Sequence, residues 1–224
     1  MGGFVFSAPC LIDSFVISVY NVWSAPSSRQ PAARIRCSIL TPQRCPLTHF
    51  ISDLLLVCST DEAEHFLQPM LNAALDVVLP LAQVLDPTDT GVVFMFWRIG
   101  DDGHRPLVVL RGGNVSPEKD GWYMENAMRK LAALADNPGI VSTAEVANPT
   151  VELFGGGTRL FDGRLAYISA GLNSWFDEMV DCIMAWSIGH TTVAEMRRVA
   201  EISKNPHLNA YLDDLEGKLR RVRQ

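Results

Sequence analysis

From residue 60 onward, the chain contains segments in which apolar side chains recur at the spacing of an α-helix. The first begins at Ser59–Glu62, where a small polar cap precedes acidic residues that suit the positive end of a helix dipole. Pro69 and Pro80 lie within this helix and can break it into two pieces. The apolar positions with helical spacing are Phe66, Met70, Ala73, Ala74, Val77, Val78 and Leu81.

The apolar run at residues 91–97 predicts a buried strand, because it is rich in Val and Phe and shows no helical spacing. Residues 100–103 predict a hairpin turn, and residues 106–110 predict the return strand, which ends at 111–114. A helix is expected next, from Ser116-Pro117-Glu118 to about Ala135. One face of this helix is expected to carry Trp122, Met128, Leu131 and Leu134.

The last third of the chain predicts strands and then three helices. Residues 151–154 are a short strand candidate, and residues 158–161 and 164–169 form two strands around Asp162-Gly163, a tight hairpin turn. The expected helices begin at a cap on Ser174, cover residues 190–203 with a Thr192–Glu195 capping box, and cover residues 208–222.

This order of elements predicts an α+β fold. The strands are connected mostly through hairpins, so the sheet should be largely antiparallel with helices packed on it. Residues 59–224 are expected to form a single α+β domain with a C-terminal helical extension. Residues 1–58 are expected to be an irregular N-terminal extension, disordered or not native.

The first 57 residues differ from the rest in charge. They hold two acidic residues, four arginines and no lysine, and the first glutamate is Glu62. Three interpretations stay open: an organellar transit peptide, a non-native extension, and a real structural element. A secretory signal fits less well, because the first charged residue is Asp13, inside an apolar run. We therefore expect a cytoplasmic protein, with organellar import if the extension is real.

Composition excludes several classes of protein. A chain of 224 residues with 48% apolar and 20% charged residues is of ordinary globular composition. The net charge of −6 argues against a nucleic-acid partner. No uninterrupted apolar run reaches the roughly 20 residues that span a membrane, so no membrane partner is expected. Five cysteines without a C-x₂-C pair indicate neither a disulfide scaffold nor a metal site.

Several residues are candidates for a binding site, each with a structural alternative. Gly155, Gly156 and Gly157 let a backbone approach a ligand closely, or form a strained turn between strands; they are not a P-loop, because no Gly-Lys-Ser/Thr follows. His104 can ligate a haem iron or lie in a solvated loop. Trp122 and Trp175 can line a groove for a flat ligand if their helices share one face of the sheet, or can pack in the core.

Acidic residues at the start of the helix after Ser174 are a further candidate. Asp177 and Asp181 are four positions apart and share a helix face, with Glu178 beside them. Paired carboxylates perform acid–base chemistry when burial shifts their pKa values. A position near a helix N-terminus explains Asp177 and Glu178 without catalysis.

A connected set of motifs in this half of the chain resembles a known family. The motifs are Gly155–Gly157 followed by Leu160, the Asp162-Gly163 turn, Ser169-Ala170-Gly171, and Asp177-Glu178 at a helix start. They resemble the C-terminal half of the GlcG/HbpS family, which includes haem-binding and haem-degrading proteins. The resemblance covers about residues 62–189. Two departures are Gly157-Thr158, where the family usually has a proline, and Ile168-Ser169-Ala170-Gly171, where it usually has Val-Ser-Gly.

The resemblance implies a profilin-like sandwich with a central, mostly antiparallel sheet, a homo-oligomer, and a small-molecule ligand such as haem, a related tetrapyrrole or a small acid. The ligand would lie in a groove between the sheet and the helix that starts near Pro117. The alternative function is a non-catalytic oligomerisation or protein-interaction module. A third hypothesis is an enzyme that uses Asp177 and Glu178, which requires a buried carboxylate beside a cleft.

Overall fold

The computed structural model describes residues 60–98, 106–160 and 163–222. The predicted extension at 1–58 and the predicted turn at 100–103 lie outside the described residues. Two short 3₁₀ turns, at Thr143–Glu145 and Pro149–Val151, lie between α3 and β3. The helices and strands are α2 (Thr60–Leu85), β1 (Gly91–Arg98), β2 (Val108–Gly113), α3 (Pro117–Asp136), β3 (Gly157–Leu160), β4 (Leu165–Ala170), α4 (Ser174–Ser187), α5 (Val193–Ser203) and α6 (Pro206–Val222).

The described strands form one sheet in the order β2-β1-β4-β3, and every neighbouring pair is antiparallel. Two hairpins, β1–β2 and β3–β4, are joined where β1 pairs with β4, with Phe94 opposite Ser169. This confirms the predicted α+β fold with an antiparallel sheet. The order of elements has one strand fewer than the sequence predicted.

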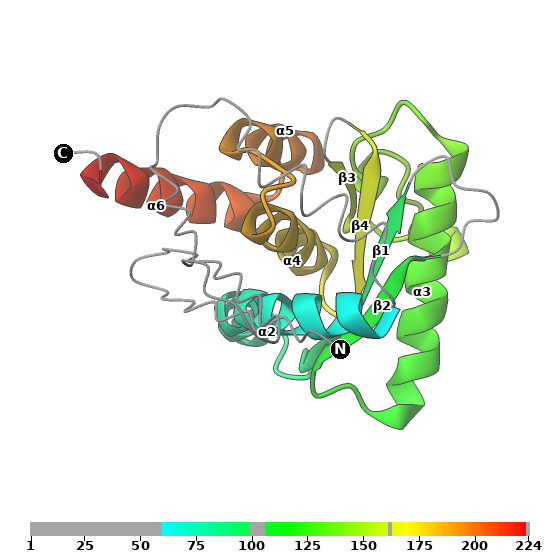
Figure 1. The fold of residues 1–224 in the computed structure, drawn as a ribbon. Helices are drawn as coiled ribbons and strands as arrows, with labels where there is room; N and C mark the ends of the chain where they lie inside the picture. Colours follow the sequence, from blue (N-terminus) through cyan, green and yellow to red (C-terminus); the bar gives the residue numbers. More distant parts are fainter. Residues whose placement is uncertain (1–59, 99–105, 161–162, 223–224) are drawn as a thin grey trace, which may run out of the picture. The chain divides into compact units, whose positions relative to one another are not determined.

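Side-chain alternation along the strands gives the sheet two apolar faces. Val93, Met95 and Trp97 of β1 pack with α3 on one face, and Phe94 and Phe96 pack toward α2 and α4 on the other. Figure 1 shows α3 on one side of the sheet and α4 on the opposite side, with α5 above α4 and α6 extending away from the sheet. The helices that carry Trp122 and Trp175 therefore lie on opposite faces.

Helix α2 is continuous through both of its prolines, so the predicted break is absent. Pro69 and Pro80 both lie on the exposed side of the helix. A proline has no N–H to donate to the carbonyl four residues earlier. These carbonyls lie on the exposed side of the helix, where water can donate instead.

Residues Glu64–Leu85 of α2 also have the length and apolar composition of a membrane-crossing helix, the one such segment among the described residues. In this structure, one side of α2 packs against β2 and α4. Its fully buried residues Leu71, Ala74 and Val78 belong to the apolar core on that face of the sheet. A role as a core helix explains these buried positions, whereas Leu81, Val84 and Leu85 at the end of α2 are exposed.

The prediction of a strand at residues 151–154 is wrong. The chain instead makes the turn Pro149–Val151, capped by the Asn148 side chain, which accepts the Thr150 N–H. Glu152 follows with a left-handed φ of 54°, which reverses the chain direction and prevents a strand. The return strand β2 also lies later than predicted, because Gly112 and Gly113 pair with Val92 and Gly91.

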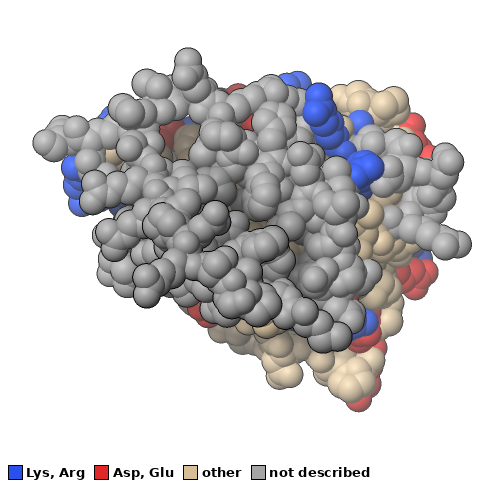
Figure 2. All heavy atoms as spheres, viewed as in Figure 1, with Lys and Arg blue, Asp and Glu red and all other residues tan. Residues whose placement is uncertain are grey.

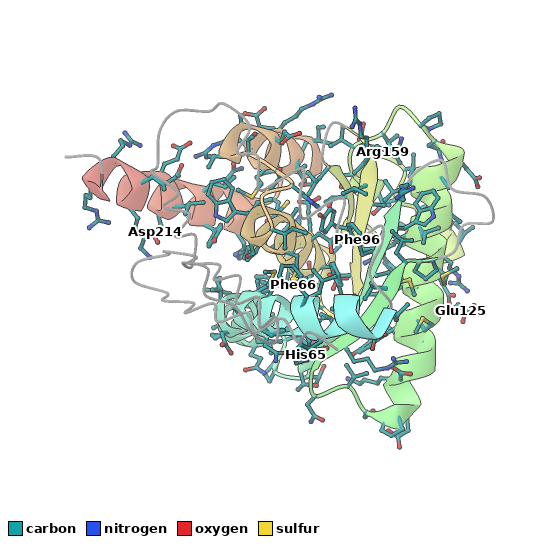
Figure 3. The ribbon with its side chains drawn as sticks, viewed as in Figure 1. His65, Phe66, Phe96, Glu125, Arg159 and Asp214 are labelled. Atoms are coloured by element: carbon teal, nitrogen blue, oxygen red, sulfur yellow. The ribbon has the colours of Figure 1, made fainter. Side chains whose placement is uncertain are left out.

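The buried face of α3 differs from the predicted one. Tyr123, Ala127, Leu131 and Leu134 are buried against the sheet, whereas Trp122 and Met128 are exposed. Glu125 lies on the side of α3 that points away from the sheet (Figure 3). The helix is rotated relative to the prediction so that the aromatic residue it buries is Tyr123.

Capping interactions fix the ends of the helices around the sheet. The predicted Thr192–Glu195 capping box of α5 is confirmed, while α4 is capped by Asn173, one residue before the predicted Ser174. The buried Arg159 of β3 donates to the carbonyls of Leu134 and Pro138 at the C-terminal end of α3 (Figure 3). A cation at this helix end also complements the helix dipole.

Candidate functional site

A small pocket lies where the glycine turn meets the start of α4 and the end of α5. Its volume is about 100 Å³, and we call it the glycine pocket. It is lined by Ala144, Ala147, Gly155, Gly156, Ser174, Trp175, Glu178 and Ser203. A larger hollow of about 280 Å³ lies between α5 and α6 and is lined by Val193, Glu216, Leu219 and Arg220. Only the glycine pocket contains a buried charged group, so we take it as the candidate site.

The carboxylate of Glu178 is the chemical centre of the glycine pocket. Its side chain is almost fully buried, with 1% of the residue exposed. Oε1 accepts hydrogen bonds from the Ser203 hydroxyl and from Asn205 Nδ2 (3.0 Å), and Oε2 accepts one from the Ser142 hydroxyl (2.8 Å). Burial raises the pKa of Glu178, although these hydrogen bonds oppose the rise.

Two of the three partners of Glu178, Ser142 and Asn205, are themselves helix caps, so they are fixed by local structure. Ser142 accepts the Ala144 N–H at the start of the Thr143–Glu145 turn. Asn205 accepts the N–H groups of His207 and Leu208 at the start of α6. Glu178 therefore connects α4 with the starts of two other elements and with the end of α5.

A buried ion pair lies directly behind the glycine turn. Lys130 of α3 donates from Nζ to Asp177 Oδ2 at 2.7 Å and to the Ser169 carbonyl at 2.6 Å, and both charged side chains are buried. The other oxygen of Asp177 accepts the Leu172 N–H. Burial raises the pKa of Asp177, and the positive charge of Lys130 opposes this rise.

Asp181 lies one turn further along α4, away from the residues that line the pocket. Its Oδ1 accepts from the Ser169 hydroxyl at 2.7 Å, and its Oδ2 has no hydrogen-bond partner among the described residues. Burial raises the pKa of Asp181 well above its usual range. In the part of the chain that the structure describes, no group of three His, Cys, Asp or Glu side chains is placed to hold a metal ion.

The three predicted glycines have different surroundings. Gly155 and Gly156 line the pocket, whereas Gly157 begins β3 and its N–H donates to the Thr143 hydroxyl at 2.9 Å. Gly156 has a φ of +101°, and a Cβ atom there would lie 2.6 Å from Cβ of Asp177. The backbone at Gly156 therefore packs directly against the Lys130–Asp177 ion pair. This close contact and the positive φ require glycine at position 156.

Of the two tryptophans predicted to line a ligand groove, Trp175 lines this pocket and Trp122 does not. Trp122 is half exposed on α3 and contacts Phe154, which precedes the glycines, but it does not line the pocket. His104 lies outside the described residues. The space between α3 and the sheet, where a ligand groove was expected, is filled by buried side chains that include Tyr123, Ala127 and Leu131.

Four residues of the site were not predicted: Lys130, Ser142, Ser203 and Asn205. Lys130 carried a signal in the sequence, since it shares a helix face with Ala127, Leu131 and Leu134, and a lysine on an apolar face needs a buried partner. The other three residues meet Glu178 only through tertiary contacts. The Ser142-x-x-Glu145 pattern and the Asn205-Pro206 pair mark helix starts in the sequence, but nothing there marks a contact with Glu178.

No known protein-family model matches this chain, and comparisons with curated proteins and with solved structures find no match. The resemblance to the GlcG/HbpS family therefore remains a prediction from the motifs given above.

Proposed function

We propose that this protein binds a small polar molecule in the glycine pocket. One observation carries the proposal: Glu178, an acidic residue that is almost completely buried, lines a pocket together with Gly155 and Gly156. A concave site with a few fixed polar groups is the usual form of a small-molecule site. The residues also come from the motifs that resemble the GlcG/HbpS family, and that resemblance supports a ligand-binding role and a profilin-like sandwich.

The volume of the pocket restricts the size of the ligand. Pockets for drug-sized ligands measure about 300–1,000 Å³, and the glycine pocket measures about 100 Å³. The pocket therefore holds only a small ligand, or one polar group of a larger ligand. We therefore propose a small ligand rather than an enclosed haem.

Binding fits this site better than catalysis. Both oxygens of Glu178 already accept hydrogen bonds, from the two serines and from Asn205. These bonds hold the carboxylate as a fixed acceptor. Three neutral donors occupy three of the about four acceptor positions of the carboxylate, so Glu178 stays hydrogen-bonded to the protein and one position is left for a ligand.

The test is a screen of molecules of two to five non-hydrogen atoms against the full-length ¹⁵N-labelled chain by NMR. We expect binders to shift the amide signals of Gly155 and Gly156 and the indole signal of Trp175. Gly155→Ala should fold normally, since its Cβ would meet Ala144 and Ser174 at 3.5 Å, but should weaken binding about tenfold by occupying part of the pocket.

Gly139→Ala is the matched control, because a Cβ at Gly139 meets nothing within 4 Å. Its affinities should equal those of the unmodified chain. The proposal is wrong if no molecule in the screen shifts the pocket signals, or if Gly155→Ala and Gly139→Ala bind equally well.

A second candidate function, an oligomerisation or interaction module, is favoured by the surface around Trp122. Trp122 is 50% exposed and lies against Phe154, and Val151 of the same loop is 62% exposed. Exposed aromatic residues of this kind are enriched in interfaces between proteins. The basic and acidic side chains visible in Figure 2 are interspersed on the coloured surface, without one dominant charged patch.

Sedimentation of the full-length chain tests this second candidate. We expect an oligomer whose population rises with concentration and falls in Trp122→Ser, because the substitution removes the exposed aromatic surface. Met128→Ser, at another exposed apolar position of α3, is the control and should leave the oligomer unchanged. A monomer at all concentrations contradicts this candidate function.

A further inference from the structure

The charge distribution around the glycine pocket indicates which ligands it can take. Lys130 is the buried lysine nearest the pocket, and its Nζ is held by Asp177 and by the Ser169 carbonyl. Glu178 has no ion-pair partner among the described residues, and its three hydrogen-bond donors are neutral side chains. The positive charge of Lys130 is the smallest of the influences that lower the pKa of Glu178, and burial outweighs all of them, so a cation in the pocket would further stabilise the carboxylate.

The same site offers little to an anion. The pocket lies at the N-terminus of α4, but Asn173 accepts the N–H groups of Trp175, Phe176 and Asp177 through its side chain and carbonyl. These donors of the first helical turn are therefore already used. The backbone of Gly156 and the Asp177 carboxylate lie against Lys130, so its ammonium group is engaged within the protein.

The remaining wall of the pocket favours a cation. Trp175 lines the pocket and is 37% exposed, and its ring also lies 5.7 Å from the ring of His207, centre to centre. An indole ring attracts cations to its face, and this attraction grows when the cation is partly removed from water. A carboxylate and an indole in one small pocket are the two groups that recognise a compact organic ammonium ion.

We infer that the ligand of the glycine pocket is a small alkylammonium cation, bound by Glu178 and Trp175. The inference rests on the proposed function and adds the chemical class of the ligand. Methylammonium, ethylammonium and trimethylammonium have two to four non-hydrogen atoms, which is small enough for a pocket of about 100 Å³. The best dissociation constants for ligands of two to four non-hydrogen atoms run from about 6 mM to about 0.04 mM.

The experiment compares three probes of similar size on the full-length ¹⁵N-labelled chain: ethylammonium, 1-propanol and acetate, at constant ionic strength. We expect ethylammonium to shift the signals of Gly155, Gly156 and the Trp175 indole at millimolar concentration. Acetate and 1-propanol should bind at least about tenfold more weakly.

Two variants test the roles of the recognising groups. Glu178→Gln keeps the side-chain length and one acceptor oxygen, removes the charge and replaces the other acceptor with a donor, and it should weaken ethylammonium binding about tenfold or more. Glu201→Gln, an exposed residue of α5, is the control of equal charge change and should have no effect. If Glu178→Gln fails to fold, Trp175→Leu provides the test, because it should weaken trimethylammonium binding more than it weakens 1-propanol binding.

The outcomes separate this inference from the proposed function. If acetate or 1-propanol binds the pocket as well as ethylammonium, the inference is overturned while the proposed function stands. If none of the probes shifts the pocket signals, and the wider screen of small molecules also finds no binder, both are overturned. Ethylammonium binding that survives both Glu178→Gln and Trp175→Leu also overturns the inference.

Discussion

Replacing Lys130 with methionine is expected to lower the free energy of unfolding by about 3–5 kcal/mol, because breaking a buried ion pair leaves an isolated buried charge. Both members of the pair are buried, and Lys130 also donates to the Ser169 carbonyl. The variant leaves Asp177 without a cation and the carbonyl without one of its donors. Urea unfolding of the full-length chain, followed by circular dichroism, measures the loss.

The pH dependence of this loss has a defined sign. Burial already raises the pKa of Asp177, and removing the positive charge of Lys130 raises the pKa further. A carboxyl group whose pKa is higher in the folded state than in the unfolded state destabilises the fold once the pH exceeds the unfolded pKa. The difference in free energy of unfolding between the unmodified chain and Lys130→Met should therefore become smaller as the pH is lowered and Asp177 takes up a proton.

Two control variants isolate the buried pair. Lys218→Met breaks the exposed ion pair with Asp214 and should change stability by less than about 1 kcal/mol. The double variant Lys130→Met/Asp177→Leu removes both charges and should recover most of the loss. If Lys130→Met costs no more than Lys218→Met, or if the double variant recovers nothing, the isolated charge of Asp177 is not the cause.

Features set by neighbouring residues in the chain were predicted correctly from the sequence. The capping box of α5 needs only Thr192 and Glu195, three positions apart, and the strand β1 follows from its uninterrupted apolar run. The prediction of a strand at 151–154 was wrong because the Asn148 side chain caps a turn there and Glu152 has a left-handed backbone conformation, although the residues themselves favour strands. The strand propensity of these residues is therefore weaker than the hydrogen bonds that form the turn.

The candidate site was predicted in part, for a physical reason. Gly155, Gly156 and Glu178 stood out because their residue types carry a chemical meaning on their own. Their partners did not stand out, because contacts such as that between Ser142 and Glu178, 36 positions apart, exist only in the folded chain. The rotation of α3, which buries Tyr123 and exposes Trp122, likewise depends on packing against the sheet.

Replacing Gly156 with alanine is expected to lower the free energy of unfolding by about 2–4 kcal/mol, from two independent causes. A φ of +101° is strained for any residue with a side chain. The added Cβ would also lie 2.6 Å from Cβ of Asp177 and 2.9 Å from the Ser174 carbonyl, so the tightly packed start of α4 has to move. Urea unfolding measures the change.

The neighbouring glycine gives the matched control. Gly155→Ala places its Cβ at ordinary contact distances of 3.5 Å, so its stability should stay within about 1 kcal/mol of the unmodified chain. If Gly155→Ala and Gly156→Ala lower the free energy of unfolding equally, strain and close contact at Gly156 are not the cause.

The methyl group of Gly156→Ala would press on the Lys130–Asp177 pair. The losses of free energy of unfolding in Gly156→Ala and Lys130→Met should therefore not be additive. The double variant Lys130→Met/Gly156→Ala should lose less than the sum of the two single losses, since removing Lys130 frees Asp177 to move away from the new methyl group.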